Sequence, residues 1–188
     1  MNLIRLPIGK QYPHIVNAIV EIPKDSNAKY EYNQELDIFV LDRCLISSMR
    51  YPASYGFIPQ TLSDDGDPLD ILVYNTVPIL TGTLVECRIV GGLLTIDNGV
   101  VDYKVLGIPL YNPNKYEDIT DIDEVFLEVT SDFFTHYKNN SKKSKPVIVE
   151  QWTNKENTMK IISEKHSVYL KSLKMSGCES PIPRIPVS

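Results

Sequence analysis

Residues 83–108 read TLVECRIVGGLLTIDNGVVDYKVLGI, and this stretch decides the fold. Apolar residues dominate 83–96, which predicts a long β-strand. Gly91-Gly92 lies in its middle, where paired glycines are typical of a bulge or a sharp bend. Asp97-Asn98-Gly99 follows as a strong hairpin-turn signal, and residues 101–108 return as the partner strand. A long, bent hairpin of this kind indicates a sheet that curls into a small closed barrel.

Four shorter stretches before this hairpin are also predicted to be β-strands, from alternation or from a short apolar run. They are residues 14–23, 28–32, 36–43 and 71–74. In the third of them, simple alternation puts Arg43 on the same face as Phe39 and Leu41. Its stem could pack on these neighbours with the head in water. Alternatively, its guanidinium could stand at the rim of a cleft and fork onto phosphate or carboxylate oxygens.

The pattern changes to a helical one after residue 118. Apolar residues recur at helical spacing from Ile119 to Tyr137, and Asp121 with Glu124 resembles a capping box. Residues 146–152 predict a last strand, and Thr153 with Glu156 predicts the start of a second helix.

The expected fold is therefore α+β and mainly β, a five-stranded OB-like closed barrel with two or more helices packed outside. We expect residues 1–175 to form a single domain and residues 176–188 to form a mobile tail, since three prolines and no periodicity mark its end.

Composition excludes several classes of function. The chain has 188 residues, a net charge of −5, 43% apolar and 23% charged residues, which is ordinary for a soluble globular domain. The negative balance argues against a general nucleic-acid-binding surface. Three widely spaced cysteines form neither a disulfide framework nor a zinc pattern, and indicate reduced thiols in a cytosolic protein. We find no apolar run of membrane-spanning length and no signal-peptide core near the start.

Residues 64–70 read Asp-Asp-Gly-Asp-Pro-Leu-Asp and place four carboxylates in seven positions. Gly66 permits a positive φ and Pro68 holds Asp67 extended, so a preset turn projects several carboxylates into a small volume. Like charges this close disfavour each other's ionisation unless a cation compensates them, and hard divalent cations prefer oxygen ligands. A solvated acidic turn between strands is the alternative explanation.

Further polar residues stand where the predicted strands and the first helix end. Each has a plain structural explanation, such as a surface pair, a turn residue or a packed tyrosine. The alternative is that they gather in one polar site. They are Glu21, Lys29, Glu31, Tyr51, Tyr55, Asp97, Asp102, Lys104, Tyr137 and Lys138.

Taken together, these residues resemble the family I soluble inorganic pyrophosphatases, of the short bacterial type, over about residues 15–152. Residues 65–71, Asp-Gly-Asp-Pro-Leu-Asp-Ile, match the family's signature. The other matches keep the family's order and nearly its spacing. They are Glu21-Ile22-Pro23, Lys29-Tyr30-Glu31, Asp42-Arg43, Tyr51-Pro52 with Tyr55-Gly56, Asp97 with Asp102 and Lys104, and His136-Tyr137-Lys138.

Two departures from the family pattern stand beside site residues. Asn98 follows Asp97 where the family usually has Glu, and Ser54 stands where Asn is common. We expect both to affect tuning more than activity. The chain past Lys174 has no assigned counterpart in the family.

The resemblance implies hydrolysis of pyrophosphate to two phosphates by a metal-activated water. It implies about three to four Mg²⁺ ions per active site with substrate bound. The implied metal ligands are Asp65, Asp70, Asp97, Asp102 and Glu21.

By the same resemblance, Asp67 is the general base, Tyr55 tunes the carboxylates through a hydrogen bond, and Arg43 forks onto the substrate. The implied substrate-binding residues are Lys29, Arg43, Tyr55, Lys104, Tyr137 and Lys138, and Glu31 and Tyr51 stand in the second sphere.

Two other functions are alternatives to pyrophosphate hydrolysis. An OB-type barrel with a degenerate metal site could bind anions or nucleic acid through basic grooves and aromatic side chains. A calcium-binding structural protein is a further alternative, but residues 64–70 lack the ligand at every second position that an EF-hand requires, and such a protein would not need Arg43 and the lysines. The resemblance further implies a cytoplasmic homohexamer, a dimer of trimers, with pyrophosphate and phosphate as ligands and neither nucleic acid nor membrane as partner.

Overall fold

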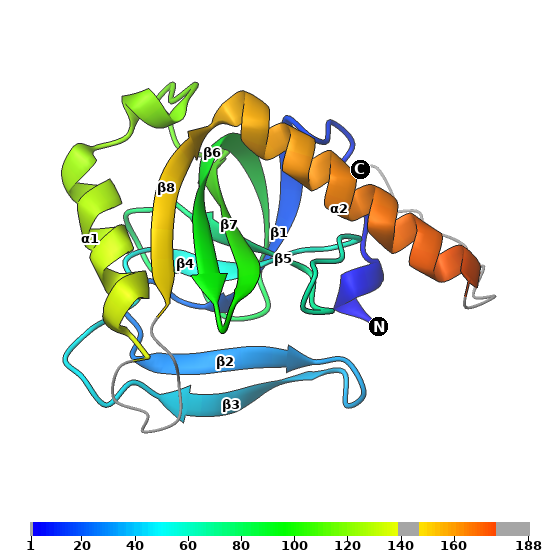
Figure 1. Ribbon diagram of the computed structural model, residues 1–188, viewed down its shortest axis with the longest axis horizontal. Helices are drawn as coiled ribbons and strands as arrows, with labels where there is room; N and C mark the ends of the chain where they lie inside the picture. Colours follow the sequence, from blue (N-terminus) through cyan, green and yellow to red (C-terminus); the bar gives the residue numbers. More distant parts are fainter. Residues whose placement is uncertain (1, 139–146, 176–188) are drawn as a thin grey trace.

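A computed structural model describes residues 2–138 and 147–175, and its ribbon is drawn in Figure 1. The predicted tail, residues 176–188, and residue 146 at the start of the last predicted strand lie outside the described residues. The strands are β1 (Ile15–Ile22), β2 (Ala28–Asn33), β3 (Ile38–Cys44), β4 (Ser54–Ile58), β5 (Leu69–Val73), β6 (Leu84–Asp97), β7 (Val100–Pro109) and β8 (Ile148–Asn154). The helices are α1 (Glu124–His136) and α2 (Lys155–Met175), with 3-10 turns η1 (Leu3–Arg5) and η2 (Ile119–Asp121).

Five strands close into a barrel. Around the ring, β1 pairs with β4, β4 with β5, β5 with β7, β7 with β6, and β6 pairs back with β1. The β5–β7 pair is parallel and the other four pairs of the ring are antiparallel. Strand β8 extends the sheet beyond β6. The predicted mainly β fold, a closed barrel of five strands with helices outside it, is confirmed.

Strand β6 makes closure possible because it serves two neighbours along one edge. Residues 84–88 pair with β1 and residues 91–96 pair with β8, while β7 occupies the other edge. The register shifts between Ile89 and Gly91, which confirms the irregularity predicted at the glycine pair. A Cβ on Gly91 would lie 2.6 Å from the Thr153 carbonyl oxygen, so a larger residue would push β8 away.

The hairpin turn between β6 and β7 is also confirmed. Asn98 and Gly99 have φ angles of 52° and 88°, the pair of positive values that a two-residue hairpin turn requires. The turn lets Asp102 and Lys104 return beside β6, at the end of the barrel where β5 begins.

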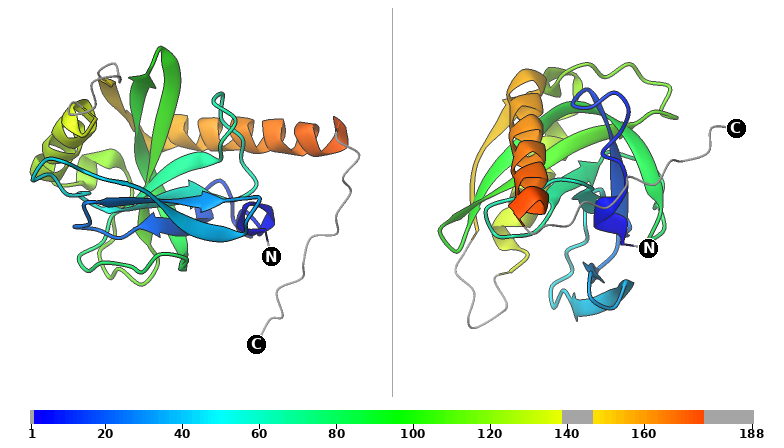
Figure 2. Two further views of the ribbon diagram at one scale, coloured as in Figure 1. Left: turned by 90° about the horizontal axis from the view of Figure 1, so that it is seen from below. Right: turned by 90° about the vertical axis from the view of Figure 1, so that its right-hand side faces the viewer.

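Both helices pack outside the barrel, as Figure 1 shows. Phe133 and Phe134 of α1 are buried against Leu72, Leu93 and other residues of one apolar cluster. Ile162 of α2 is buried in a second cluster with the side chains of β1, β5 and β7. Figure 2 shows the last turns of α2 projecting beyond the barrel. No helix within the described ranges is long and apolar enough to cross a membrane.

The caps of both helices differ from the prediction. Asp123 caps α1 by accepting the Val125 N–H at 2.9 Å, whereas the capping box joins Asp118 and Asp121 around η2. Asn154 accepts the Asn157 N–H at 3.0 Å and so begins α2 in place of Thr153. Helix α1 does not begin at Asp121 because residues 119–121 form the separate 3-10 turn η2, which ends before α1 begins at Glu124.

Strands β2 and β3 form a separate two-stranded sheet, drawn below the barrel in Figure 1. Lys29 is paired with Arg43, but the next residue, Tyr30, is paired with Leu41, so Asp42 is an extra residue on β3. Cross-strand partners share a face, and this bulge therefore moves Arg43 to the face opposite Leu41. The predicted sharing of a face by Arg43 and Leu41 is wrong for this reason.

Candidate active site

One cavity of about 290 Å³ opens between the barrel, the β2–β3 sheet and the end of α1. It gathers predicted site residues that are more than a hundred positions apart in the sequence. Those that line it are Glu21, Lys29, Glu31, Tyr51, Tyr55, Asp65, Asp67, Asp70, Asp97, Asp102, Lys104, Tyr137 and Lys138. Arg43 is the predicted residue that does not line it.

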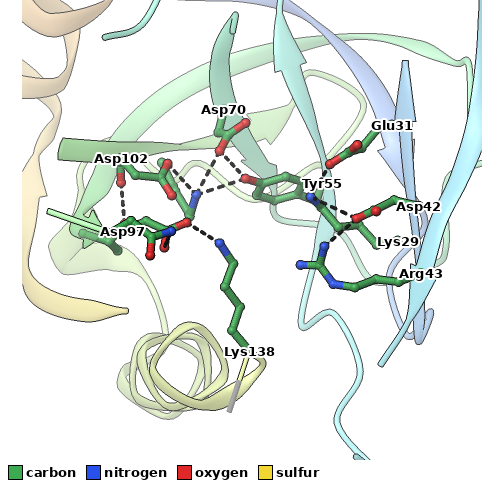
Figure 3. Close-up of polar contacts among 12 residues, drawn as sticks. Lys29, Glu31, Asp42, Arg43, Tyr55, Asp70, Asp97, Asp102 and Lys138 are labelled. Carbon is green, nitrogen blue, oxygen red and sulfur yellow. Dashed lines mark hydrogen bonds and ion pairs between the residues drawn. The ribbon is translucent and has the colours of Figure 1, made fainter. Parts of the chain in front are cut away.

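The innermost group joins four side chains from three barrel strands. Asp70 of β5 and Lys104 of β7 are register partners, and Asp102 lies two residues earlier on the same face. The Lys104 Nζ donates to Asp70 Oδ2 at 2.9 Å, to Asp102 Oδ1 at 2.8 Å and to the Tyr55 hydroxyl at 3.0 Å. The Tyr55 hydroxyl in turn donates to Asp70, and Figure 3 shows Tyr55, Asp70 and Asp102 converging.

Charge compensation holds this group together. Lys104 is 1% exposed, and burial alone would lower its pKa, but attraction by Asp70 and Asp102 outweighs burial and raises the pKa above its ordinary value. Burial raises the pKa of Asp70, and repulsion by Asp102 adds to this while Lys104 opposes it. Burial and both carboxylates raise the pKa of Tyr55, which therefore stays a hydrogen-bond donor.

Lys138 supplies a further positive charge to the cavity. It follows the end of α1, and its Nζ forms an ion pair with Asp97 at the end of β6 (Figure 3). Burial alone would lower the pKa of Lys138, but Tyr137 and Asp97 together raise it. Tyr137 is fixed by stacking on Phe133, with the ring centroids 5.2 Å apart. The helix thus delivers both residues to the site.

The acidic turn lies at the open side of the cavity. The Asp67 N–H donates to Asp65 Oδ1 at 3.1 Å, and the Ser63 N–H donates to the Asp67 carbonyl oxygen at 2.8 Å. Partial burial, followed by repulsion from Asp65 and Glu31, raises the pKa of Asp67. A carboxylate with a raised pKa that still faces solvent is suited to accept a proton from water.

The β2–β3 sheet carries a chain of charges beside the cavity. Lys29 forms an ion pair with Glu31 and lies 3.6 Å from Asp42, which also forms an ion pair with Arg43. Figure 3 shows these four side chains from the two strands. The bulge at Asp42 places its carboxylate between the two cations. The sequence offers Asp42 only as part of the Asp42-Arg43 motif, and no signal in it predicts this position between Lys29 and Arg43.

Glu21 ties the small sheet to the barrel. Glu21 lies on β1, and its Oε1 accepts the N–H of Tyr32 on β2 at 2.8 Å. Burial raises the pKa of Glu21 to about 8, with a further contribution from Asp70 and opposing ones from the Tyr32 N–H and Lys29. Glu21 was predicted as a metal ligand, and this hydrogen bond gives it a structural contact as well.

The donor set of the cavity fits hard cations. Among the described residues, seven carboxylate side chains and three lysines line the cavity, so the carboxylates outnumber the positive charges available to compensate them. The raised pKa values of Glu21, Asp67 and Asp70 report this uncompensated charge and the burial. Within residues 2–138 and 147–175, no three acidic, histidine or cysteine side chains form a ready-made metal cage. Mg²⁺ binds through one or two carboxylates and keeps several waters, and it therefore suits such a loose set.

Phe134 lines the cavity without having been predicted as a site residue. Lys104 Nζ stands 5.0 Å from the centre of its ring and 5.4 Å from that of Tyr55. Aromatic faces attract cations, so the two rings help to hold the buried ammonium group. In the sequence, Phe134 is one of several apolar residues at helical spacing, and nothing separates it from the core residues beside it.

Comparison with known proteins identifies the family. A family model described as "Inorganic pyrophosphatase" matches residues 18–170, a range that contains all of the predicted site residues. The chain belongs to the inorganic pyrophosphatase family. An inorganic pyrophosphatase of Thermus thermophilus is 42% identical over 158 residues, covering 82% of this chain and 90% of that protein. One of Caulobacter vibrioides is 37% identical over 167 residues, covering 86% and 94%.

Solved structures of inorganic pyrophosphatases share the architecture. The crystal structure of the inorganic pyrophosphatase from Thermus thermophilus superposes with a TM-score of 0.88 at 39% identity, covering 90% of this chain and 99% of that one. The barrel and its helices are therefore those of an inorganic pyrophosphatase.

Ser54 is one of the two residues that depart from the family pattern. It is buried and its hydroxyl accepts the Lys24 N–H at 3.2 Å, so it joins the start of β4 to the chain that follows β1.

Proposed function

We propose that this chain hydrolyses inorganic pyrophosphate to two phosphates, with water as the nucleophile and Mg²⁺ as the metal. The observation that carries the proposal is the cavity in which Lys104 joins Asp70, Asp102 and Tyr55, and which Lys138 and the acidic turn also line. Membership of the inorganic pyrophosphatase family supports the same reaction. The difficulty of this reaction lies in bringing water to an anion whose leaving group is also charged.

We propose that the basic residues bind and orient the two phosphates. Lys29, Lys104, Lys138 and Tyr137 all line the cavity, where their ammonium and hydroxyl groups can donate to phosphate oxygens. Arg43 lies across from Lys29 on the neighbouring strand, where its fork can reach substrate oxygens at the rim. Glu31 holds Lys29 in place through an ion pair. Tyr51 holds Tyr55 in place through ring packing, with the ring centroids 5.7 Å apart.

Asp67 is the proposed general base. Its raised pKa and its place at the open side of the cavity allow it to take the proton of the attacking water. Tyr55 stays protonated and donates to Asp70, which fixes the orientation of that carboxylate.

Asp65, Asp70, Asp97, Asp102 and Glu21 would hold the Mg²⁺ ions, about three to four with substrate bound in the manner of metal-assisted phosphoryl transfer. When bound, these ions supply an attacking water of lowered pKa and neutralise charge on the phosphate oxygens. The oxygen-only donor set of the cavity supports this choice of ion.

The alternative of a nucleic-acid-binding module has less support. A phosphate backbone needs a positively charged groove, and the carboxylates in this cavity outnumber its lysines among the described residues. The cavity can accept a polyanion only together with cations, which is the pyrophosphatase arrangement.

We further propose a homohexamer, a dimer of trimers, and a cytoplasmic location, as the family resemblance implies. Val125 and Val129 of α1 and Ile148 of β8 are 64%, 52% and 54% exposed, and covering such apolar side chains favours association. Cys44 and Cys87 carry free thiols, which supports a reducing compartment. We also propose that residues 1–175 act as one domain.

The test is phosphate release from pyrophosphate by the purified chain, with Mg²⁺ and then with a chelator, beside the Asp70→Asn variant. We expect rapid Mg²⁺-dependent release that the chelator and the variant both abolish. Absence of release with several divalent cations would reject the proposal, and binding of labelled single-stranded nucleic acid would then be measured.

A further inference from the structure

The segment that carries the acidic turn, residues 59–68 between β4 and β5, is fastened to the middle of α2. The Gln60 carbonyl oxygen lies 2.6 Å from His166 Nδ1, and the Leu62 N–H donates to the Lys165 carbonyl oxygen at 3.1 Å. The Lys165 Nζ also pairs with Asp64 Oδ1 at 2.7 Å. Two consecutive helix residues thus hold the segment at three points, Gln60, Leu62 and Asp64.

His166 is built into this contact. Its residue is 7% exposed, and its ring lies edge-on against Tyr12 at 4.8 Å between centroids. A carbonyl oxygen can only accept a hydrogen bond, so Nδ1 must carry the proton that it shares with Gln60. A buried imidazole whose donor is aimed at one loop carbonyl fixes the position of that peptide group.

Gln60 itself has a backbone that needs outside support. Its φ is 56°, a region that non-glycine residues rarely adopt. Its N–H donates to the Ile4 carbonyl oxygen at 2.8 Å. The neighbouring Thr61 hydroxyl donates to Ile58 at 2.6 Å and accepts the Leu69 N–H at 2.8 Å. The start of the segment is therefore held on every side by hydrogen bonds.

The fastened part is one hydrogen bond away from the proposed base. The Ser63 N–H donates to the Asp67 carbonyl oxygen at 2.8 Å, and the Gly66 N–H donates to the Ser63 carbonyl oxygen at 3.1 Å. Asp67 is an exposed residue, and its N–H donates to Asp65 Oδ1 within the same turn. Its position therefore depends on residues 60–64 as well as on the start of β5, and α2 is one of the elements that hold residues 60–64.

We propose that His166 and Lys165 are positioning residues that hold Asp67 in reach of the attacking water. This inference rests on the proposed role of Asp67 as general base. Neither residue lines the cavity, so neither touches substrate. Their effect passes through the backbone of the acidic turn, and it should appear in kcat rather than in the binding of pyrophosphate by the lysines.

The test compares two substitutions of His166 in the full-length chain. In His166→Asn the side-chain amide keeps a donor at about the place of Nδ1, whereas His166→Leu fills space without a donor. We expect His166→Leu to lower kcat by about ten- to a hundredfold, the range for a displaced catalytic group, with KM changed less than about twofold. We expect His166→Asn to restore kcat to within about threefold of wild type.

The decisive comparison is made in an Asp67→Asn background. If His166 acts through Asp67, His166→Leu should lower kcat there by less than about twofold, because the group it positions is already gone. An equal loss of kcat in both backgrounds would overturn the inference, since general loosening of the fold would be the cause. A parallel fall in kcat for the Leu and Asn variants would overturn it as well.

Lys165 provides a second route should His166→Leu fail to fold. Lys165→Met and Asp64→Asn both break the ion pair at 2.7 Å, and Lys165→Arg keeps it. We expect Lys165→Met and the double variant to lose the same activity, with Lys165→Arg near wild type. Independent, additive losses would reject positioning by this pair.

If Asp67→Asn alone leaves kcat unchanged, the proposed base role fails, and the His166 result then stands as a separate measurement of how α2 affects turnover.

Discussion

Replacing Lys104 by Met tests the central charge arrangement most directly. The substitution keeps an unbranched side chain of similar length and removes the ammonium group. That group is the shared partner of Asp70, Asp102 and Tyr55, at 2.9, 2.8 and 3.0 Å. Without it, two carboxylates in the wall of the barrel lose their positive partner, and the loss should appear in the free energy of unfolding.

The expected size follows from the exposure of the two carboxylates. Removing one partner of a buried ion pair costs about 3–5 kcal/mol in unfolding free energy. The side chains of Asp70 and Asp102 are 27% and 18% exposed, so water still reaches them and the lower end applies. A loss of about 3 kcal/mol in a domain of this size lowers Tm by roughly 6–12 °C.

Thermal unfolding followed by circular dichroism in a chelator measures this difference, with Lys29→Met as the control. Lys29 belongs to the same cavity, but its partner Glu31 is 49% exposed, so its loss should cost less than about 1 kcal/mol. Saturating Mg²⁺ should recover part of the Lys104→Met loss, because cations compensate the same carboxylates.

The loss of unfolding free energy from Lys104→Met should also shrink as the pH falls. Burial already raises the pKa of Asp70, and without Lys104 that pKa rises further. A carboxyl group with a raised pKa destabilises the fold while it is ionised and ceases to do so as falling pH protonates it.

Equal Tm values for Lys104→Met and Lys29→Met in the chelator would refute this account of the site.

Three further predictions concern activity. Asp67→Asn should leave Mg²⁺ binding by calorimetry unchanged and lower kcat by about 10²–10⁴, the usual contribution of a general base; unchanged rates at every pH would remove that role. Arg43→Lys keeps the charge but loses the fork, and should lower kcat/KM about fivefold, the worth of about one net hydrogen bond; equal kinetics would show that charge alone matters there. Tyr55→Phe deletes the hydroxyl between Lys104 and Asp70 and should cost about 1–2 kcal/mol in chemical unfolding, with a lowered kcat; a variant as stable as wild type would mean that the hydroxyl holds neither partner.

Much of the barrel could be predicted from residues 83–108 because its signals are local. A glycine pair within an apolar strand and an Asn-Gly turn restrict the backbone directly, and both features are confirmed. The helix starts were harder because several acidic residues stand close together before α1. Asp118, Asp121 and Asp123 can each cap a helix, and the choice among them depends on where η2 packs.

The alternation of β3 failed at one residue for a similar reason. A bulge adds a residue to one strand only, and its position depends on the partner strand. Asp42 occupies that extra position between Lys29 and Arg43, and the face of Arg43 is reversed relative to simple alternation. The exposed Val125 and Val129 show the same limit, since helical spacing predicts a stripe but not what covers it.

The sequence by itself determined which residue types the site has, because the acidic turn and the spaced charges are fixed along the chain and resemble one enzyme family. It also determined the barrel, because turns and alternation act over a few residues. Only the tertiary structure decided which carboxylate each lysine compensates, since Lys104 meets Asp70 across two parallel strands and Lys138 meets Asp97 from a helix. The fastening of the acidic turn to His166 was likewise decided by packing, across 106 positions of sequence.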